Sequence, residues 1–323
     1  MDILSPVRLQ PINVTKIWGA KQMQGSLAAH MQVPPGVGEV WLASASEQVT
    51  KVADGPFAGM GLDELYKAFG RKLAGDEYKG EFPLTLKLLN VGDWLSVQVH
   101  EDEARETEVG EVWHVLFAED AAREIVMGLK IGAGRQEVEE AVERGDLTEL
   151  LAKIPARTCD TFFLPSGTVH SVGPGLLIFE LQQPKGAAYR FHDWNRLDAN
   201  GSQRQLHHEK ALQALTLNGH APSEPLRQLE VYSAPNRLRL LVETPTFALL
   251  RVDASQTYRP WWGGARMRVV FVLEGQAHMC SPGGYFEPLE VRAGQTWLLP
   301  AILTTPLFMP QGEGKLSILE AVA

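Results

Sequence analysis

Residues 95–100 read LSVQVH, an alternation of apolar and polar side chains. Because successive side chains of a strand point to opposite faces, a strand here would place its leucine and two valines on one face and Ser96, Gln98 and His100 on the other. A polar face exposed to solvent accounts for this pattern. An interior site on which Gln98 and His100 converge accounts for it equally well, and the stretch by itself leaves both interpretations open.

The rest of the chain extends the pattern of this stretch. Short apolar runs rich in Val, Ile, Leu, Phe and Trp are separated at close intervals by Gly, Pro and Asp, which is typical of an all-β sandwich or barrel. The first strands are expected at residues 82–90, 94–100, 112–118, 123–130, 161–167 and 176–183. The strand pattern restarts beyond about residue 220 and continues to the final run KLSILEA.

One segment has helical periodicity instead. Residues 137–154, EVEEAVERGDLTELLAKI, carry apolar side chains at helical spacing and acidic residues near the start, which predicts a short helical insert. Shorter helices are expected at residues 61–70 and 207–215. The proline-containing polar segment APSEPLRQ, residues 221–228, is typical of a linker between two β-barrels in tandem.

The composition narrows the class of protein. A chain of 323 residues with 45% hydrophobic and 21% charged residues is typical of a soluble globular protein. Its net charge of -9 argues against nucleic acid as a partner, because binding to phosphate backbones needs clustered Lys and Arg. The start lacks the pattern of a secretory signal, and the apolar runs are too short to cross a membrane, so we expect a cytoplasmic protein. Cys159 and Cys280 lie far apart, which favours reduced thiols.

Three polar residues on separate expected strands suggest a metal site. His100 is followed by Glu111 in GEVWHVL, and Pro165 and Gly167 shape a turn before His170 in FFLPSGTVHSVG. Nitrogen and carboxylate ligands from neighbouring strands suit a divalent ion, with zinc favoured and a position left open for substrate or water. Each residue alone also has a structural explanation, because a lone strand histidine is more often hydrogen-bonded or exposed than a ligand.

Several motifs together resemble a known family. They are SVQVH (96–100), GEVWHVL (110–116), FFLPSGTVHSVGPGLLIFELQQ (162–183), YRFHDWNR (189–196) and LHHEKAL (206–212), with IWGA and GEVWLAS earlier in the chain. This set resembles the type I phosphomannose isomerases, in their short bacterial form, which belong to the cupin superfamily. The resemblance implies a mainly β fold of two tandem cupin, or jelly-roll, barrels. It also implies the interconversion of mannose 6-phosphate and fructose 6-phosphate with one zinc ion per chain.

The resemblance implies roles for individual residues. Carried over by motif, the zinc ligands are Gln98, His100, Glu111 and His170. An alternative for these residues is a buried polar network without metal, which would be costly because buried polar groups need partners.

Further positions match residues of the sugar-phosphate pocket of the family. Lys87 and Ser96 match residues that line this pocket, and Glu180 matches an acidic residue near the metal. Arg190 matches an arginine placed by the substrate, and Arg196 stands where many members have a basic residue for phosphate. The resemblance therefore implies a catalytic set of Arg190, Lys87 and Glu180 and a substrate-binding set of Ser96, Arg190 and Arg196. Surface solubility is the alternative for both arginines.

Two positions depart from the pattern of the family. Val109 stands where relatives carry a lysine, and Gly186 stands where relatives carry an aspartate. Both missing groups are among those proposed for proton transfer, so the resemblance implies an isomerase with an altered proton relay. Glu180, Lys87 and His114 remain as candidates for the base.

The two expected barrels differ in their ligands. We expect the first barrel, residues 1–220, to hold the metal and the insert. In the second, residues 226–323, the stretch RAGQTWLLPAILTTP lacks the histidine that follows Pro-x-Gly in the first, and His278 is the only histidine. A single imidazole seldom makes a metal site, so we expect the second barrel to be structural and free of metal.

The sequence leaves three functions open. The first is an active zinc-dependent aldose–ketose isomerase that acts on mannose 6-phosphate, with a modified proton relay. The second is a metal-containing cupin that binds a sugar or sugar phosphate without turnover. An iron dioxygenase on the same barrel is weaker, because its usual His-x-His is Gln98-x-His100 here. The oligomeric state is not indicated by the sequence.

Overall fold

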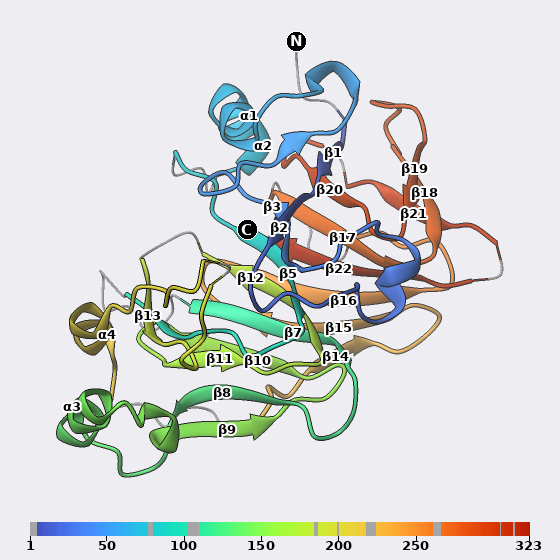
Figure 1. The fold of residues 1–323 in the computed structure, drawn as a ribbon. Helices are drawn as coiled ribbons and strands as arrows, with labels where there is room; N and C mark the ends of the chain where they lie inside the picture. Colours follow the sequence, from blue (N-terminus) through green and yellow to red (C-terminus); the bar gives the residue numbers. More distant parts are fainter. Residues whose placement is uncertain are drawn as a thin grey trace.

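The protein is described by a computed structural model that covers residues 5–76, 80–101, 110–183, 187–198, 200–217, 224–260, 266–303, 305–312 and 314–323. β-Strands are the main secondary structure of these residues, and a few short helices lie at the two ends of the molecule (Figure 1). The prediction of a mainly β protein is confirmed. In the described part of the chain, the strands form four sheets with open edges, and none of these sheets closes into a cylinder.

Two of the sheets are built mainly from the first half of the chain. The first has six strands in the order β10-β7-β12-β5-β3-β2, with bounds β2 Ile12–Thr15, β3 Val37–Ala43, β5 Thr85–Val91, β7 Gly110–Ala118, β10 Thr161–Pro165 and β12 Leu176–Gln182. The second has five strands in the order β13-β6-β11-β8-β9, with bounds β6 Val97–His100, β8 Glu124–Leu129, β9 Leu151–Pro155, β11 His170–Val172 and β13 Ala188–His192.

The other two sheets are built mainly from the second half. An eight-stranded sheet has the order β14-β15-β16-β22-β17-β20-β1-β4, with bounds β1 Val7–Gln10, β4 Lys51–Val52, β14 Leu229–Tyr232, β15 Arg237–Glu243, β16 Ala248–Ala254, β17 Arg268–Glu274, β20 Thr296–Leu299 and β22 Leu316–Val322. A three-stranded sheet has the order β19-β18-β21, with bounds β18 Gln276–Cys280, β19 Leu289–Arg292 and β21 Leu307–Pro310.

The sheets pack face to face because most strands alternate apolar side chains between two cores. On β7, Trp113 belongs to the core shared with the five-stranded sheet, whereas its neighbour Val112 belongs to the core shared with the eight-stranded sheet. Phe179 and Phe271 stack across the latter core, with ring centroids 6.0 Å apart. A strand buried on both faces can place polar side chains between two sheets only where they have partners.

The helices lie outside the stack of sheets (Figure 1). Their bounds are α1 Leu62–Phe69, α2 Arg71–Ala74, α3 Arg135–Arg144 and α4 His208–Ala214. Buried residues of α3 and α4 pack on the outer face of the five-stranded sheet, in one core with Val97 and Val99 of β6. Among the described residues, none of these helices has the length and apolar character needed to cross a lipid bilayer.

The helical insert is shorter than the sequence predicted. The helix predicted over residues 137–154 is α3, which ends at Arg144 because Gly145 takes a left-handed conformation with φ 77°. A 3-10 turn, Leu147–Leu150, follows. The expected helical end of the segment is instead strand β9, Leu151–Pro155, which pairs with β8. Its apolar residues Leu151 and Ile154 fit a helix and a strand equally, and the pairing with β8 decides between them.

The first strands of the chain lie among the C-terminal ones. β1 pairs with β20, and β4 pairs with β1, so both belong to the eight-stranded sheet. The division into residues 1–220 and 226–323 stays a prediction. Any boundary has to accommodate these N-terminal strands, which no local sequence pattern assigns to a distant sheet.

The second half of the molecule contains a buried ion pair that supports a stability prediction. The side chains of Arg268 and Glu320 are 3% and 1% exposed, with 2.9 Å between Nε and Oε1. The Tyr258 hydroxyl donates to the other Glu320 oxygen at 2.9 Å. Replacing one member of a buried pair leaves a carboxylate without its cation. We expect Arg268→Met to lower the free energy of unfolding by about 3–5 kcal/mol in urea titrations.

The exposed pair of Arg237 with Glu230 provides the control for this variant. Arg237→Met should change the free energy of unfolding by less than about 1 kcal/mol, since solvent screens exposed pairs. An Arg268→Met protein as stable as the wild type would contradict the assignment of this pair as buried and interdependent.

Candidate metal centre and substrate site

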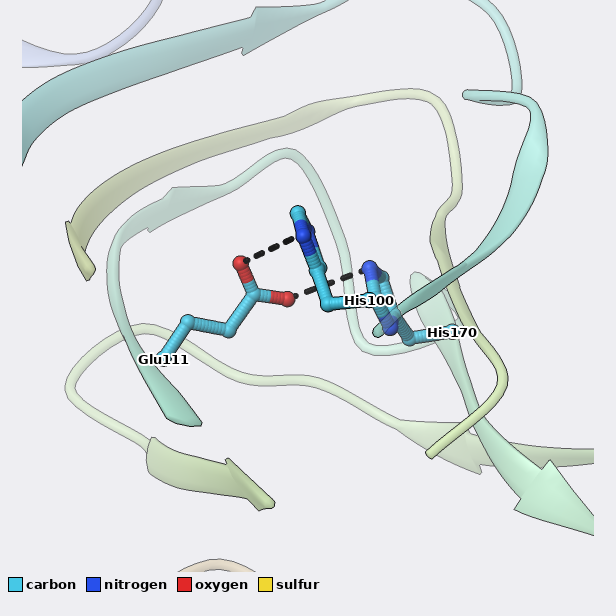
Figure 2. A group of neighbouring side chains, drawn as sticks. All are labelled: His100, Glu111 and His170. Carbon is cyan, nitrogen blue, oxygen red and sulfur yellow. Dashed lines mark ion pairs between the residues drawn. The ribbon is translucent and has the colours of Figure 1, made fainter. Parts of the chain in front are cut away.

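Three of the four predicted metal ligands meet between the two sheets of the first half. His100 on β6 and His170 on β11 come from the five-stranded sheet, and Glu111 on β7 comes from the six-stranded sheet that faces it (Figure 2). Glu111 Oε2 lies 3.7 Å from His100 Nε2, and Glu111 Oε1 lies 3.2 Å from His170 Nε2. One ligand atom from each residue falls within 4.8 Å of the others, a grouping that suits a single cation.

The Pro165–His170 turn holds the two histidines in place. Gly167 has φ 80°, a conformation that glycine adopts without strain, and its amide donates to the His100 carbonyl at 3.0 Å. His170 Nδ1 bonds the Thr168 carbonyl at 2.8 Å. The carbonyl can only accept, so the hydrogen resides on Nδ1 and the Nε2 lone pair is free to bind a metal. The two imidazole rings lie stacked, with centroids 5.3 Å apart.

Burial sets the charge state of this cluster. It lowers the pKa of His170 to about 4 and the pKa of His100 well below its ordinary value, so both rings are neutral near pH 7. Burial, with the nearby Glu180 carboxylate, raises the pKa of Glu111. Within the described residues, His170 Nε2 and Glu111 Oε1 are buried without a hydrogen-bond partner. Two neutral imidazoles and a carboxylate with unsatisfied atoms fit a divalent cation.

Gln98, the fourth predicted ligand, occupies the same face of the sheet. It stands opposite His170 on one side and opposite Arg190 on the other. Directly paired residues of adjacent strands share a face, so Gln98 lies between the histidine and the arginine. Its role as a metal ligand stays a prediction.

The expected apolar face of LSVQVH is only partly regular. Val97 and Val99 pack on the side of the helices, as the alternation predicted. Leu95 precedes the first residue of β6 and belongs instead to the core between the two sheets. Ser96, also before the strand, is buried at 6% exposure. The metal-side face of this strand is therefore made by Gln98 and His100.

A second polar group lies beside the metal ligands. Lys87 on β5 and Glu180 on β12 are paired residues of neighbouring strands, and Lys87 Nζ lies 2.6 Å from Glu180 Oε1. Trp113 Nε1 donates to Glu180 Oε2 at 3.2 Å, and its ring contacts His170 edge-on. Burial lowers the Lys87 pKa, but the surrounding carboxylates, Glu180 foremost, outweigh it and raise that pKa overall. Lys87 is therefore an ammonium ion at neutral pH.

His114 is excluded from this group by its position. It follows Trp113 on β7 and points to the opposite face, where its Nδ1 lies 2.9 Å from Thr161 Oγ1. Burial, with the charges of Arg251 and Arg239, lowers its pKa to about 3. The suggestion that His114 could serve as the base is therefore wrong. The two altered positions, Val109 and Gly186, lie outside the described residues.

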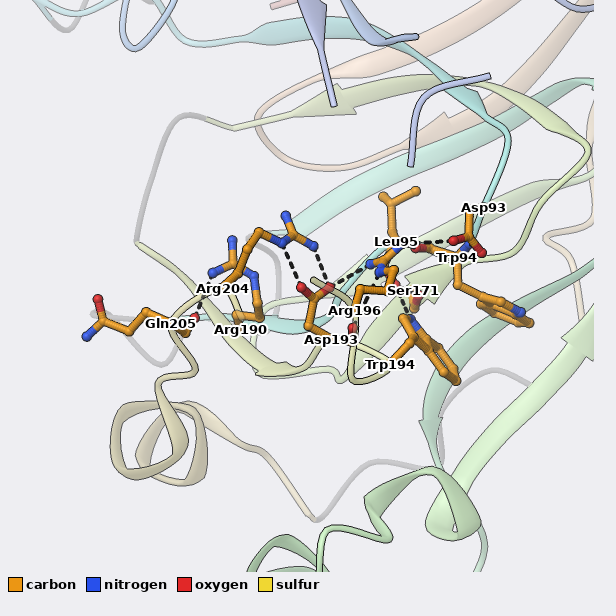
Figure 3. Close-up of polar contacts among 10 residues, drawn as sticks. All are labelled: Asp93, Trp94, Leu95, Ser171, Arg190, Asp193, Trp194, Arg196, Arg204 and Gln205. Atoms are coloured by element: carbon orange, nitrogen blue, oxygen red, sulfur yellow. Dashed lines mark hydrogen bonds and ion pairs between the residues drawn. The ribbon is translucent and has the colours of Figure 1, made fainter. Parts of the chain in front are cut away.

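The two predicted arginines lie at and beyond the edge strand β13 (Figure 3). Arg190 Nη1 donates to the Gln205 carbonyl at 2.7 Å. Arg196 reaches the Asp193 carboxylate through Nη2 at 2.6 Å and the Trp94 carbonyl through Nη1. The structure adds residues that the sequence did not single out. The contacts of two of them, Asp193 and Arg204, depend on loop geometry, and those of the other two depend on how neighbouring strands pack, which no periodicity reveals. They are Asp193, Arg204, Trp113 and Gln182, the last of which lines a small cavity beside His100 and Glu111.

Comparisons with known proteins agree with this arrangement. A family model described as the catalytic domain of phosphomannose isomerase type I matches residues 7–124. The chain is 34% identical over 307 residues to the mannose-6-phosphate isomerase of Streptococcus mutans. The alignment covers 91% of this chain and 92% of the relative. It is 31% identical over 313 residues to the mannose-6-phosphate isomerase ManA of Bacillus subtilis, covering 91% of this chain and 93% of that one.

Solved structures share the fold over nearly the whole chain. The mannose 6-phosphate isomerase of Bacillus subtilis superposes with a TM-score of 0.84 and 27% identity, covering 98% of this chain and 99% of the other. The Salmonella typhimurium enzyme, described with fructose 6-phosphate and zinc, superposes with a TM-score of 0.70 at 14% identity over 98% of this chain and 99% of the other. The predicted cupin-type fold is confirmed by these likenesses. The chain belongs to the family of type I phosphomannose isomerases.

Proposed function

We propose that this protein is a zinc-dependent aldose–ketose isomerase that interconverts mannose 6-phosphate and fructose 6-phosphate. The observation that carries the proposal is the buried His100–Glu111–His170 cluster, in which Glu111 Oε1 and His170 Nε2 have no hydrogen-bond partner in the described residues. Membership of the family supplies the substrate class, and the related Salmonella typhimurium structure was described with fructose 6-phosphate and zinc.

One zinc ion per chain would be held by His100, Glu111 and His170, with Gln98 as a fourth ligand. A bound zinc ion would be a Lewis acid that stabilises the negative charge developing on a sugar oxygen. The ligand atoms would be two neutral imidazole nitrogens and one carboxylate oxygen, and these groups lie close together in the structure. This combination is typical of catalytic zinc sites that keep a position open.

The remaining residues of the site would handle the proton and the substrate. An aldose–ketose isomerisation moves a proton between C1 and C2, which requires a positioned base. We propose Glu180 for this role, with Lys87 as the ammonium ion that holds its carboxylate in place at 2.6 Å. Ser96 and Arg190 remain the proposed substrate-binding residues. Arg196, which the sequence also predicted for this role, has each of its guanidinium nitrogens bonded to the protein. Because Val109 and Gly186 replace two groups implicated in the relay, turnover should depend more heavily on Glu180 than in relatives.

The two halves of the chain have different roles in this proposal. We propose that residues 1–220 form the catalytic unit and that residues 226–323 form a structural unit without metal. The core that joins the six- and eight-stranded sheets supports this, since apolar residues of both halves bury one another there. We propose a cytoplasmic enzyme whose partner is a small sugar phosphate rather than nucleic acid or a membrane.

One observation favours a second function, a metal-containing cupin that binds sugar phosphate without turnover. Two positions linked to proton transfer in the family carry valine and glycine, Val109 and Gly186, neither of which can donate or accept a side-chain proton. The metal ligands are independent of those two positions, so binding could persist where catalysis does not.

A coupled enzyme assay separates the two functions. We expect the purified, zinc-loaded protein to form fructose 6-phosphate from mannose 6-phosphate, followed through a reporter enzyme that consumes fructose 6-phosphate. Heat-inactivated protein and a His170→Ala variant serve as controls. Sugar-phosphate binding in calorimetry without any product would favour the binding module and overturn the isomerase.

A further inference from the structure

Three arginines gather around one buried carboxylate at the edge of the substrate site. Asp193 is 5% exposed and follows strand β13 directly. Its carboxylate accepts from Arg204 Nε at 2.7 Å, from Arg204 Nη2, and from Arg196 Nη2 at 2.6 Å (Figure 3). Arg190 lies next to this group and carries no carboxylate of its own among the contacts drawn.

The three guanidinium groups differ in the donors that they have left. Arg196 uses Nε for the Asp193 carbonyl at 3.3 Å, Nη1 for the Trp94 carbonyl and Nη2 for the Asp193 carboxylate. Each of its nitrogens is therefore already bonded to the protein. Since a guanidinium has five N–H donors in a fixed fork, a group whose three nitrogens are all engaged is poorly placed to grip an anion as well.

The other two arginines keep donors in reserve. Arg204 binds Asp193 through Nε and Nη2, and in the described part of the chain its Nη1 makes no hydrogen bond. Arg190 uses Nη1 for the Gln205 carbonyl, while its Nε is buried and has no partner among the described residues. Unsatisfied donors of a half-buried cation call for an acceptor.

The charge of the group favours an anion as that acceptor. Three guanidinium groups face one buried carboxylate, Asp193, and one more exposed carboxylate, Asp93, which lies 3.5 Å from Arg196 Nη1. An excess of positive charge remains, and burial with the repulsion from Arg204 lowers the pKa of Arg190. A phosphate has several acceptor oxygens, so it can accept hydrogen bonds from two neighbouring guanidinium groups at once.

The position of Arg190 relates this anion site to the metal ligands. Arg190 stands opposite Gln98, and Gln98 stands opposite His170. Two strand spacings separate the arginine from the histidine, roughly 10 Å between backbones. A hexose 6-phosphate that placed its reacting carbons at the metal would extend its phosphate toward the arginine end of this row.

The loop that carries Arg196 has a different task. Trp194 and Asn195 both adopt left-handed conformations, with φ 56° and 53°. Asparagine adopts this conformation readily, but it is strained for the bulky Trp194. Trp194 Nε1 donates to the Leu95 carbonyl at 2.5 Å, and Arg196 binds the neighbouring Trp94 carbonyl. These contacts hold the strained turn against the segment before β6.

We infer that Arg190 and Arg204 are the two residues that bind the substrate phosphate. Asp193 is the positioning residue that orients Arg204. Arg196 stabilises the loop and is not a phosphate ligand. The inference rests on the proposed function for the identity of the sugar, but the anion site itself does not depend on turnover. Inorganic phosphate is therefore a sufficient probe.

Binding and kinetics are measured on four variants of the full-length, zinc-loaded protein. Arg204→Met should raise the dissociation constant of inorganic phosphate, measured by calorimetry, and the KM for mannose 6-phosphate by about 10–100-fold, as expected for one charge-assisted contact. Its kcat should fall by less than about threefold, since the reacting carbons are remote. Arg204→Lys keeps the charge but not the fork, and should recover only part of the loss.

Two further variants separate positioning from structure. Asp193→Asn keeps the shape of the side chain but releases Arg204, and should raise KM and the phosphate dissociation constant with little change in kcat. Arg196→Met should lower the midpoint of thermal unfolding and weaken phosphate binding less than Arg204→Met does. Arg237→Met, at an exposed pair with Glu230 in the other half of the chain, is the matched control.

Each result decides between the alternatives. A wild-type protein that fails to bind millimolar phosphate, or an Arg196→Met variant that loses phosphate binding while Arg204→Met keeps it, would overturn the inference. Phosphate binding that follows the expected order in a protein without isomerase activity would uphold the inference and overturn the proposed function alone. Should Arg204→Met fail to fold, Arg204→Lys carries the same test with the charge retained.

Discussion

Replacing His170 by alanine should abolish isomerase activity and remove the metal. His170 Nε2 faces Glu111 at 3.2 Å, and its other nitrogen is fixed by the Thr168 carbonyl, so alanine removes an oriented neutral donor from a small ligand set. Lewis-acid stabilisation is worth several kcal/mol, so kcat/KM should fall on the order of 10³-fold or more. The measurements are zinc per chain by elemental analysis and product formation in the coupled assay.

His278→Ala is the matched control for this variant, since His278 lies on β18 in the other half of the molecule. It should retain about one zinc per chain and wild-type turnover. A chelator should reduce the wild type to the level of His170→Ala, and added zinc should restore the wild type alone. A wild-type protein that stays free of metal after zinc loading, yet turns over substrate, would refute the metal centre.

Local patterns in the sequence predicted those parts of the fold that depend on side-chain alternation. On β6 the alternation correctly placed Val97 and Val99 together on one face, in the core that they share with the helices. The same rule failed at Leu95, which precedes the strand and is therefore not bound by its period.

Long-range contacts were beyond any local pattern. The pairing of β1 with β20 joins residues near the two ends of the chain, and no periodicity in either strand indicates its partner. The end of the helical insert was missed for a related reason. Apolar residues near Leu151 fit a helix and a strand equally, and the pairing with β8 decided between them.

The clustered metal ligands, which lie on strands, were predictable, whereas the contact of Asp193 with Arg204, which depends on a loop, was not. Resemblance to the family named His100, Glu111 and His170, and the structure brings them together. Asp193 and Arg204 are eleven residues apart, and their contact depends on how the intervening loop folds back. The sequence therefore indicated an arginine for phosphate but could not say which of several arginines has free donors.

Glu180→Gln should lower kcat by about 10²–10⁴-fold, the usual contribution of a positioned acid–base group, while zinc content and KM change little. Glutamine keeps the size of the side chain and can still accept a hydrogen bond from Trp113, which donates to Glu180 at 3.2 Å. It cannot accept a proton from a sugar carbon, nor can it balance the buried Lys87 ammonium 2.6 Å away. Glu230→Gln, at an exposed pair, is the control for removal of a carboxylate.

A double-mutant cycle with Lys87→Met identifies how Glu180 acts. If the two residues work as one unit, with Lys87 holding the carboxylate that moves the proton, the losses in kcat should not add, and the double variant should be within about tenfold of Glu180→Gln. Methionine fills the space of the lysine stem without leaving a buried charge, so thermal unfolding can verify that the double variant remains folded. Full addition of the two losses would mean that Lys87 has a separate role toward the substrate. A Glu180→Gln protein with the wild-type kcat would show that the proton is moved by another group, and that the carboxylate serves only to keep Lys87 charged between the two sheets.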